Sequence, residues 1–357
     1  MTILGTRPEI IRLSRVIRQL DQFCDHVLAH TGQNYDPMLN DVFFDELGVR
    51  QPDIYMGVKE LTFADQIGQI LSHTGRILAE HKPDRLLLLG DTNSALSAIV
   101  AARMGIPVYH MEAGNRCYDN RVPEEINRRI IDHSSDVLMP YTHRSKENLL
   151  HEGVERQRIF VVGNPIYEVL QAYQDHIGAS QVLRQFDVSR QAFFLATLHR
   201  AENVDQPARL SNLLEGLSHV GETYQQPVLV SLHPRTAHKI ASFGISIRSP
   251  WVRVTEPLGF FDFVALEQQA RCVLSDSGTV QEECCILGVP NVTIRDVTER
   301  AETIEVGSNI LSGVDPDMIL HCVKTVLRSA SWVPPVEYTV ENVSQTVVKI
   351  ILGYHYL

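Results

Sequence analysis

Short apolar runs alternate with segments of helical periodicity along the whole chain. In the first half the apolar runs are 85–90, 107–111, 136–140 and 158–163. In the second half they are 192–199, 227–233, 251–255, 271–278 and 290–294. Short apolar strands that alternate with helices are typical of parallel sheets covered on both faces. The pattern predicts an α/β protein with two Rossmann-like, doubly wound parallel sheets.

The chain length of 357 residues suits about two domains. We expect the polar, glutamine-rich stretch 164–190 to connect them. The predicted domains are therefore an N-terminal domain over 1–170 and a C-terminal domain over 171–340. The final segment, 341–357, contains the helical pattern ENVSQTVVKIIL and is expected to pack back on the N-terminal domain.

The charge balance of the chain limits its partners. With 32 Lys and Arg against 43 Asp and Glu, the net charge is -11. Binding to nucleic acid or to an anionic membrane needs basic surface, so neither partner is expected. There is also no apolar run of the roughly 18 residues that span a membrane, and no secretory signal pattern. We therefore expect a cytoplasmic protein.

No cofactor or metal is expected either. The six cysteines include no C-x-x-C pair, and they are interpreted as reduced, mostly buried residues. No cluster of His, Cys and carboxylates has the spacing of metal ligands. The dinucleotide fingerprint G-x-G-x-x-G and the Walker-type G-x-x-x-x-G-K-[ST] are both missing.

In open parallel sheets, ligands bind beyond the carboxyl ends of the strands, so the turns after the apolar runs are the candidate sites. The first turn reads Gly5-Thr6-Arg7-Pro8-Glu9. Pro8 suits a helix start, and Gly5 allows a tight turn. A helix N-terminus with the guanidinium of Arg7 beside it predicts an anion site. A capped helix with a solvated arginine is the alternative for this turn alone.

Three carboxylates occupy later turns of the first half. Asp91 follows the run 85–90, Glu112 follows 107–111, and Glu124 lies at the start of a helix. Asp91 alone would also suit a helix N-cap. We expect the three to converge with Arg116 and Arg128, because such a charge cluster is costly to bury without a function.

The helix that begins near Pro123 carries two charge pairs with a spacing of four residues. Glu124 and Arg128 should face the same side, where Arg128 can position the carboxylate. Glu125 and Arg129, on the neighbouring face, are expected to form a surface pair.

The second half contains an equivalent set of turns. His199 ends one strand, with a catalytic and a structural role about equally expected, whereas His233 is expected to be structural. Ser277 and its neighbours form a strand-to-helix turn that suits a diphosphate. Glu283, two turns into that helix, could accept both ribose hydroxyls of a nucleotide. The aromatic stretch 259–263 could contact a base or belong to the core.

Seven motifs together resemble the non-hydrolysing UDP-N-acetylglucosamine 2-epimerase family, which has the GT-B fold. They lie in the family's order and at similar spacing over essentially the whole chain. They are GTRPE (5–9), GDT (90–92), HMEAGNR (110–116), PEEINR (123–128), HRAEN (199–203), DSGTVQEE (276–283) and RDVTER (295–300). The resemblance implies an active site in the cleft between the two domains.

The resemblance also assigns expected roles to individual residues. Those expected to act in catalysis are Asp91, Glu112, Glu124, Arg128 and His199. Those expected to bind UDP or the sugar are Arg7, Pro8, Arg12, Arg116, Ser277, Gly278, Thr279, Glu283 and Arg300.

The chain departs from the family pattern at several positions. Arg12 stands where the family has lysine, and Thr279 replaces the second glycine of a DSGG turn. The segment 110–121 differs beside the sugar site, which leaves the substrate's substituents open. In the family's regulatory segment, here 31–36, only Gln33 matches well, so activation by a second substrate molecule is expected to be weak or absent.

The implied activity is epimerisation at carbon 2 of a UDP-N-acetylhexosamine, most simply UDP-N-acetylglucosamine to UDP-N-acetylmannosamine, for polysaccharide biosynthesis. The family resemblance also implies a homodimer. A modified UDP-sugar, such as UDP-2,3-diacetamido-2,3-dideoxyglucuronate or a precursor of UDP-N-acetyl-fucosamine, is the first alternative. A glycosyltransferase of the GT-B fold and a non-catalytic nucleotide-sugar sensor are two further alternatives.

Overall fold

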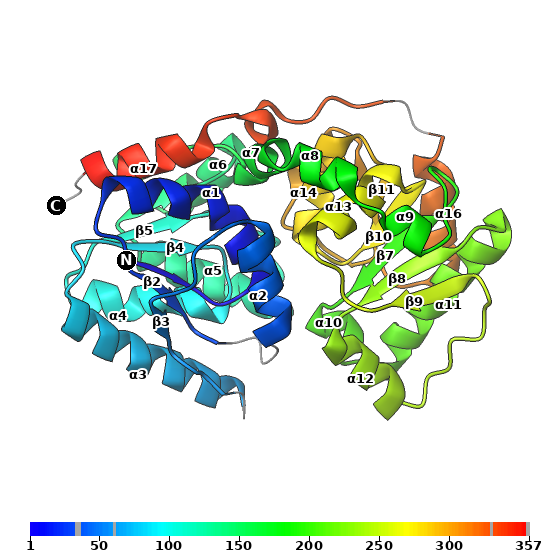
Figure 1. Ribbon diagram of the computed structural model, residues 1–357, viewed down its shortest axis with the longest axis horizontal. Helices are drawn as coiled ribbons and strands as arrows, with labels where there is room; N and C mark the ends of the chain where they lie inside the picture. Colours follow the sequence, from blue (N-terminus) through cyan, green and yellow to red (C-terminus); the bar gives the residue numbers. More distant parts are fainter. Residues whose placement is uncertain (33–36, 60–61, 329–330, 355–357) are drawn as a thin grey trace. The chain divides into compact units, whose positions relative to one another are not determined.

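The computed structural model describes residues 1–32, 37–59, 62–328 and 331–354. The chain divides into two compact units (Figure 1). Unit 1 comprises Met1–Ala172 and Val336–Leu357, and unit 2 comprises Tyr173–Pro335. In the part of the chain that the structure describes, no helix is long and apolar enough to cross a membrane.

Unit 1 is built on a six-stranded parallel sheet with the strand order β3-β2-β1-β4-β5-β6. Its strands are β1 (Thr2–Leu4), β2 (Leu28–His30), β3 (Ile54–Tyr55), β4 (Leu86–Leu89), β5 (Val108–Met111) and β6 (Val137–Met139). The chain crosses from β3 to β4 over the helix α3, so the strand order reverses at β1 and β4. This reversal is where parallel α/β sheets place their ligands.

Helices cover both faces of this sheet. α1 and α17 pack against each other on one face, while α3 and α4 lie on the other (Figure 1). The helices of unit 1 are α1 (Arg7–Phe23), α2 (Pro37–Glu46), α3 (Phe63–His81), α4 (Ser97–Arg103), α5 (Pro123–His133), α6 (His143–His151), α7 (Pro165–Ala172) and α17 (Val343–Gly353).

Unit 2 contains a second six-stranded parallel sheet, with the order β12-β11-β10-β7-β8-β9. Its strands are β7 (Phe194–Leu198), β8 (Val228–Leu232), β9 (Val252–Thr255), β10 (Cys272–Ser275), β11 (Asn291–Thr293) and β12 (Asn309–Leu311). Its helices are α8 (Gln174–Ala179), α9 (Val182–Gln185), α10 (Ala201–Val204), α11 (Pro207–Tyr224), α12 (Pro234–Ser242), α13 (Phe260–Gln269), α14 (Gly278–Leu287), α15 (Ala301–Glu305) and α16 (Pro316–Val326).

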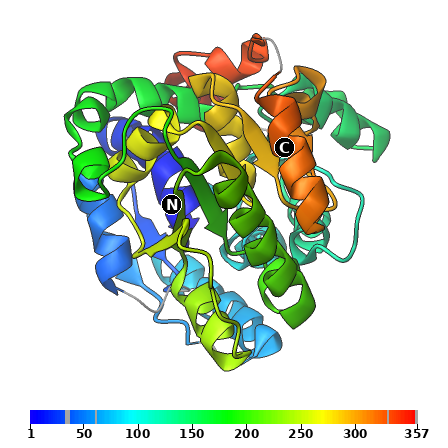
Figure 2. The same ribbon diagram turned by 90° about the vertical axis from the view of Figure 1, so that its right-hand side faces the viewer.

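The core of unit 2 lies between its sheet and two long helices. α11 (green) and α16 (orange) run side by side over one face of the sheet (Figures 1 and 2). Alternate residues of β7 and β8, such as Phe194, Ala196 and Val230, are fully buried against these helices. This alternation fits the two-residue period of a strand, in which every second side chain faces the same side.

The two predicted doubly wound parallel sheets are confirmed, and eight of the nine apolar runs contain strands. The run 158–163 forms only a single bridge, between Ile159 and Leu138. The nine apolar runs do not include β1, β2, β3 and β12, each of which has only two or three residues. Strands this short contain too few residues for an apolar period to be visible.

The stretch 164–190, predicted as a connecting segment, is largely helical and contains α7, α8 and α9. The prediction missed these helices because each of them is only four to eight residues long, too short for a helical period to stand out. Ile166 and Val169 of α7 are nevertheless fully buried, as are Ile177 and Val182 in α8 and α9. The predicted cut at 170–171 lies two residues before the unit boundary, and α17 forms as the pattern in 341–352 predicts.

Gly221 in α11 provides a test of this packing. A Cβ atom at this position would lie 2.5 Å from Cβ of Trp251. We expect Gly221→Ala to lower the free energy of unfolding by about 1–3 kcal/mol, because overpacking outweighs the higher helix propensity of alanine. Gly178→Ala in α8, where nothing lies within 4 Å, is the matched control and should be neutral or stabilising. Urea unfolding of both variants measures the difference, and equal stabilities would contradict the packing described here.

Candidate functional site

In unit 1, three functional turns lie at the carboxyl ends of adjacent strands. β1 is followed by Gly5, β4 by Gly90 and Asp91, and β5 by Glu112. Since β1, β4 and β5 are neighbours in the sheet, their turns meet at one edge. The sequence predicted this convergence from the strand-end rule alone.

Glu112 has an unusual backbone conformation and a buried side chain. Its φ of 65° lies in the left-handed region, which is uncommon for a residue with a Cβ atom. Its carboxylate forms an ion pair with Arg12, and both side chains are almost fully buried. Asn115 donates a second hydrogen bond to it at 3.3 Å. Such strained positions cluster at functional sites, where the surroundings enforce the conformation.

Asp91 is held by an arginine and is not a helix cap. Nε of Arg128 lies 2.8 Å from Oδ2 of Asp91, and the same guanidinium donates to Glu125 at 2.7 Å. The N-cap of the following 3₁₀ helix, η1 (Asn93–Leu96), is Thr92. Asn127 of α5 also donates to the backbone carbonyl of Asp91 at 3.0 Å. The first residues of α5 therefore fix the turn after β4.

The expectation of a surface pair between Glu125 and Arg129 is wrong for Glu125. Glu125 is fully buried, whereas the Arg129 side chain is 40% exposed and 3.4 Å away. The Glu125 carboxylate instead accepts hydrogen bonds from the backbone N–H groups of Cys117 and Tyr118, at 3.1 and 3.0 Å. The spacing of four residues predicted the pair. It could not show that the loop 115–121 folds over the face of α5 that carries Glu125. Glu124, the second residue of α5, is half-buried.

Arg116 lies in a buried network below the Glu112 turn. Its guanidinium binds Asp132 at 2.8 Å and Glu152 at 2.7 Å. Burial alone would lower the pKa of Arg116, but the hydrogen bonds with Glu152 and the charge of Asp132 outweigh burial and raise it. Asp132 also accepts from the backbone N–H of Gly114 at 3.1 Å. The predicted contact of Arg116 with substrate stays a prediction, because its observed partners support the turn instead.

His110 links this network to the Asp91 turn. Its Nδ1 lies 2.9 Å from Asp132, and its Nε2 lies 2.8 Å from the carbonyl oxygen of Gly90. His110 lies two residues before Glu112, and Gly90 is the residue before Asp91. This buried histidine thus connects the turns that carry the two candidate carboxylates. The sequence motif contained His110, but nothing in its spacing indicated that both ring nitrogens would be used.

The first turn is organised by Glu9. Its carboxylate accepts from the backbone N–H of Gly5 at 3.0 Å, from the hydroxyl of Thr6 at 2.7 Å and from the hydroxyl of Ser94 at 2.6 Å. It therefore joins the turn after β1 to η1, which follows Asp91. Arg7 begins α1, is half-buried, and places its guanidinium 5.7 Å from the ring centroid of Phe43. Pro8, the second residue of α1, is exposed.

In unit 2, Asp276 fixes the position of His199. Oδ1 of Asp276 lies 3.0 Å from Nδ1 of His199, whose side chain is 41% exposed. The same carboxylate accepts from the backbone N–H groups of His199 and Arg200, at 3.1 and 3.0 Å. Burial would raise the pKa of Asp276, but His199 and these amides lower it to about 2. Asp276 directly follows β10, and this strand-end position was the signal that could have identified it.

The turn after β10 begins α14 with open backbone donors. Ser277 is the N-cap, and its side chain forms no capping hydrogen bond. The first N–H groups of α14, starting at Gly278, therefore point along the helix axis beyond its N-terminal end. A Cβ atom at Gly278 would lie 2.6 Å from the Glu299 carboxylate and 3.5 Å from the Arg300 guanidinium, so a larger residue would require the Glu299 side chain to move. Thr279, which follows, is half-buried. The predicted contact of this helix start with a diphosphate stays a prediction.

Arg300 and Glu283 are both buried. Nε of Arg300 lies 2.5 Å from Glu282, so this arginine is bound within unit 2. Glu283, on the next position of α14, retains only 3% of its accessible surface. Their predicted contacts with substrate stay predictions.

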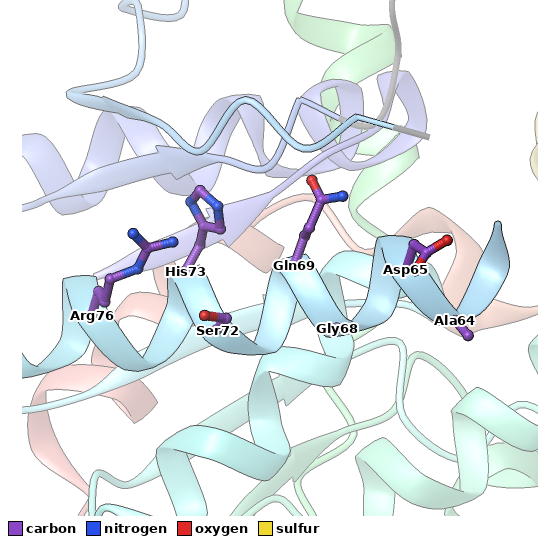
Figure 3. Close-up of a pocket in the computed structure, with 7 residues that line it drawn as sticks. All are labelled: Ala64, Asp65, Gly68, Gln69, Ser72, His73 and Arg76. Carbon is purple, nitrogen blue, oxygen red and sulfur yellow. The ribbon is translucent and has the colours of Figure 1, made fainter. Parts of the chain in front are cut away.

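A hollow of about 370 Å³ lies elsewhere in unit 1, along α3 (Figure 3). Residues between Ala64 and Arg76 line it, and Gln69 and His73 project from the helix. None of the predicted site residues belongs to this hollow. Gln33, the residue that matches the family's regulatory segment, lies outside the described residues.

Comparison with known proteins identifies the class of this chain. The model of the UDP-N-acetylglucosamine 2-epimerase family matches residues 18–352. A protein of Methanocaldococcus jannaschii named UDP-N-acetylglucosamine 2-epimerase is 41% identical over 93% of both chains. A Pseudomonas aeruginosa protein named UDP-2,3-diacetamido-2,3-dideoxy-D-glucuronate 2-epimerase is 36% identical over 92% of both chains.

A solved structure agrees with these matches. The UDP-GlcNAc 2-epimerase of Methanocaldococcus jannaschii, in complex with UDP-GlcNAc and UDP, superimposes with a TM-score of 0.93 at 39% identity over 98% of both chains. The chain belongs to the UDP-N-acetylglucosamine 2-epimerase family and is an isomerase with a GT-B-type fold. The resemblance inferred from the seven motifs is thereby confirmed.

Glu9 should make the stability of the protein depend on pH near neutrality. Burial raises the pKa of Glu9 from 4.5 to about 7, despite the hydrogen bonds that it accepts. Because the folded pKa is the higher one, its contribution is fully present below pH 4.5 and is lost as the pH rises through 7. The ionisation of Glu9 should therefore lower the free energy of unfolding by about 3 kcal/mol as the pH rises from below 4.5 to above 7.

Urea unfolding of the natural chain and of Glu9→Gln between pH 5 and pH 8 tests this expectation. Glutamine cannot ionise, so the stability difference between the two chains should change across this range in favour of the variant. A difference that stays constant with pH would contradict the raised pKa of Glu9.

Proposed function

We propose that this chain epimerises carbon 2 of UDP-N-acetylglucosamine to give UDP-N-acetylmannosamine, without net hydrolysis. Membership of the family supports the reaction class. The observation that carries the proposal is Glu112, a buried carboxylate on a strained turn beside Arg12 and near the Asp91 turn. A GT-B glycosyltransferase would not need several carboxylates at this edge of the sheet.

The chemistry of the substrate explains the need for these groups. The proton on carbon 2 is not next to a carbonyl group, so direct removal would leave an unstabilised carbanion. Elimination avoids this, because the bond from the anomeric carbon to the UDP oxygen breaks as the carbon 2 proton is removed. The products of this step are UDP and 2-acetamidoglucal. UDP then adds back, and a proton is delivered to the opposite face of carbon 2.

The departing UDP gains negative charge that must be stabilised. The open backbone N–H groups at the start of α14 suit its diphosphate, with Ser277 and Gly278 closest to that helix end. His199, oriented by Asp276, and Arg7 are the further donors that we assign to the leaving group. Glu283 is assigned to the ribose hydroxyls.

Proton transfer on two faces of a sugar ring needs separate acid and base groups. We assign these roles to Asp91, Glu112 and Glu124. Arg128 and Arg12 hold Asp91 and Glu112 by ion pairs, which favours their ionised forms and fixes their orientation. Which of the carboxylates removes the proton from the substrate is a question for the variants described below.

A modified sugar is the second candidate substrate. The Pseudomonas aeruginosa relative named for UDP-2,3-diacetamido-2,3-dideoxy-D-glucuronate shares 36% identity, close to the values of relatives named for UDP-N-acetylglucosamine. The loop 115–121, part of the segment 110–121 that departs from the family pattern, is held by Glu125 beside the carboxylate turns. In this proposal the enzyme acts in the cytoplasm as a homodimer and supplies precursors for polysaccharides.

The substrate can be identified by proton NMR in deuterated water. With UDP-N-acetylglucosamine, we expect UDP-N-acetylmannosamine to appear with deuterium at carbon 2, because the removed proton exchanges with solvent. Absence of product and exchange, in protein that binds UDP, would reject this substrate and favour the diacetamido sugar. The same measurement with that sugar is the direct comparison.

Substitution of the carboxylates tests their assigned roles. We expect Asp91→Asn, Glu112→Gln and Glu124→Gln each to lower kcat by about 10²–10⁴-fold, because each removes a proton-transfer group. Binding of UDP, measured by calorimetry, should be retained, since the UDP donors lie elsewhere. Glu80→Gln, an exposed carboxylate on α3, is the control and should leave both quantities unchanged. Full activity in all three variants would refute the proposed chemistry.

A further inference from the structure

Glu267 is a carboxylic acid in the apolar interior of unit 2. It follows the buried residues Val264, Ala265 and Leu266 on α13 and has no exposed surface. Among the described residues, no N–H or hydroxyl group donates a hydrogen bond to either of its oxygens. An ionised carboxylate in such a place is strongly disfavoured, so this position requires an explanation beyond packing.

The polar neighbour of Glu267 is Glu283, on the adjacent helix α14 (Figure 1). Two ionised carboxylates only accept hydrogen bonds, so a bond between them needs a proton on one of the two. Burial and the charge of Glu283 raise the pKa of Glu267 well above its usual range. The buried thiol of Cys284 beside them brings no positive charge. The hydrogen bond between the two carboxyl groups therefore places a proton on one of them.

The position of Glu283 gives this pair a connection to the ligand site. Gly278, at the start of α14, belongs to the turn that we assign to the diphosphate, and Glu283 lies five residues further along. At 1.5 Å per residue this is about 8 Å along the helix. That separation suits the distance from the diphosphate of a nucleotide to its ribose hydroxyls.

We propose that Glu267 is a positioning residue. Its protonated carboxyl group donates a hydrogen bond to Glu283 and so orients the Glu283 carboxylate to accept hydrogen bonds from the ribose hydroxyls of UDP. This inference rests on the proposed function, which places UDP in unit 2. Donation from the ribose hydroxyls favours the ionised form of Glu283, so the proton stays on Glu267.

Two variants of Glu267 separate this role from packing. Glu267→Leu removes the donor, whereas Glu267→Gln keeps a similar shape and can still donate an N–H to Glu283. Gln268→Leu on the same helix is the control for an added apolar side chain. The dissociation constants of UDP and of 2′,3′-dideoxyuridine diphosphate are measured by calorimetry for each variant, together with kcat and KM.

We expect Glu267→Leu to weaken UDP binding roughly 10-fold or more, since it removes a hydrogen bond to a charged group. Binding of the dideoxy nucleotide should be nearly unchanged. KM should rise with little change in kcat, because the ribose contact is made equally in the ground and transition states. Glu267→Gln and Gln268→Leu should both resemble the natural chain.

If Glu267→Leu weakened the binding of UDP and of the dideoxy nucleotide equally, the inference would be overturned, because this result would indicate general damage to unit 2. Unchanged UDP binding in Glu267→Leu would overturn it as well. If the natural chain epimerises the sugar but does not prefer UDP over the dideoxy nucleotide, this inference fails while the proposed function stands. If the natural chain neither binds UDP nor epimerises the sugar, both fail.

Discussion

The carboxyl edge of the sheet in unit 1 depends on buried ion pairs between carboxylates and arginines. Glu112 is held by Arg12, and Asp91 is held by Arg128. A buried carboxylate without a partner would take up a proton or draw in water. The pairs balance the charge of the carboxylates and orient them, and the left-handed turn at Glu112 is maintained by the network around it. The remaining features of this edge follow from the need to hold these pairs in place.

The carboxyl edge of the sheet in unit 2 carries hydrogen-bond donors. It offers donors to an anion, through the start of α14 and the imidazole of His199. The buried carboxylate of Asp276 sets the direction of that imidazole and binds the backbone beside it. Unit 1 thus presents carboxylates and unit 2 presents hydrogen-bond donors, although both are built on the same type of sheet.

Much of this organisation could be predicted from the sequence. The strand-end rule located Asp91, Glu112 and Ser277, because topology places the turns of adjacent parallel strands together. It could not assign partners, because those depend on how loops fold over helices. Arg116 therefore proved to bind Asp132 and Glu152. The buried acids that organise the turns were missed for the same reason, since a carboxylate on a helix has the same pattern whether it is solvated or enclosed.

In the proposed reaction, the bond between the anomeric carbon and the UDP oxygen breaks during epimerisation. Positional isotope exchange tests it most directly. UDP-N-acetylglucosamine labelled with ¹⁸O in that bridging position is incubated with the enzyme and followed by ³¹P NMR. We expect the label to move into non-bridging positions of the β-phosphate while the sugar epimerises. Epimerisation with the label fixed in the bridge would contradict it.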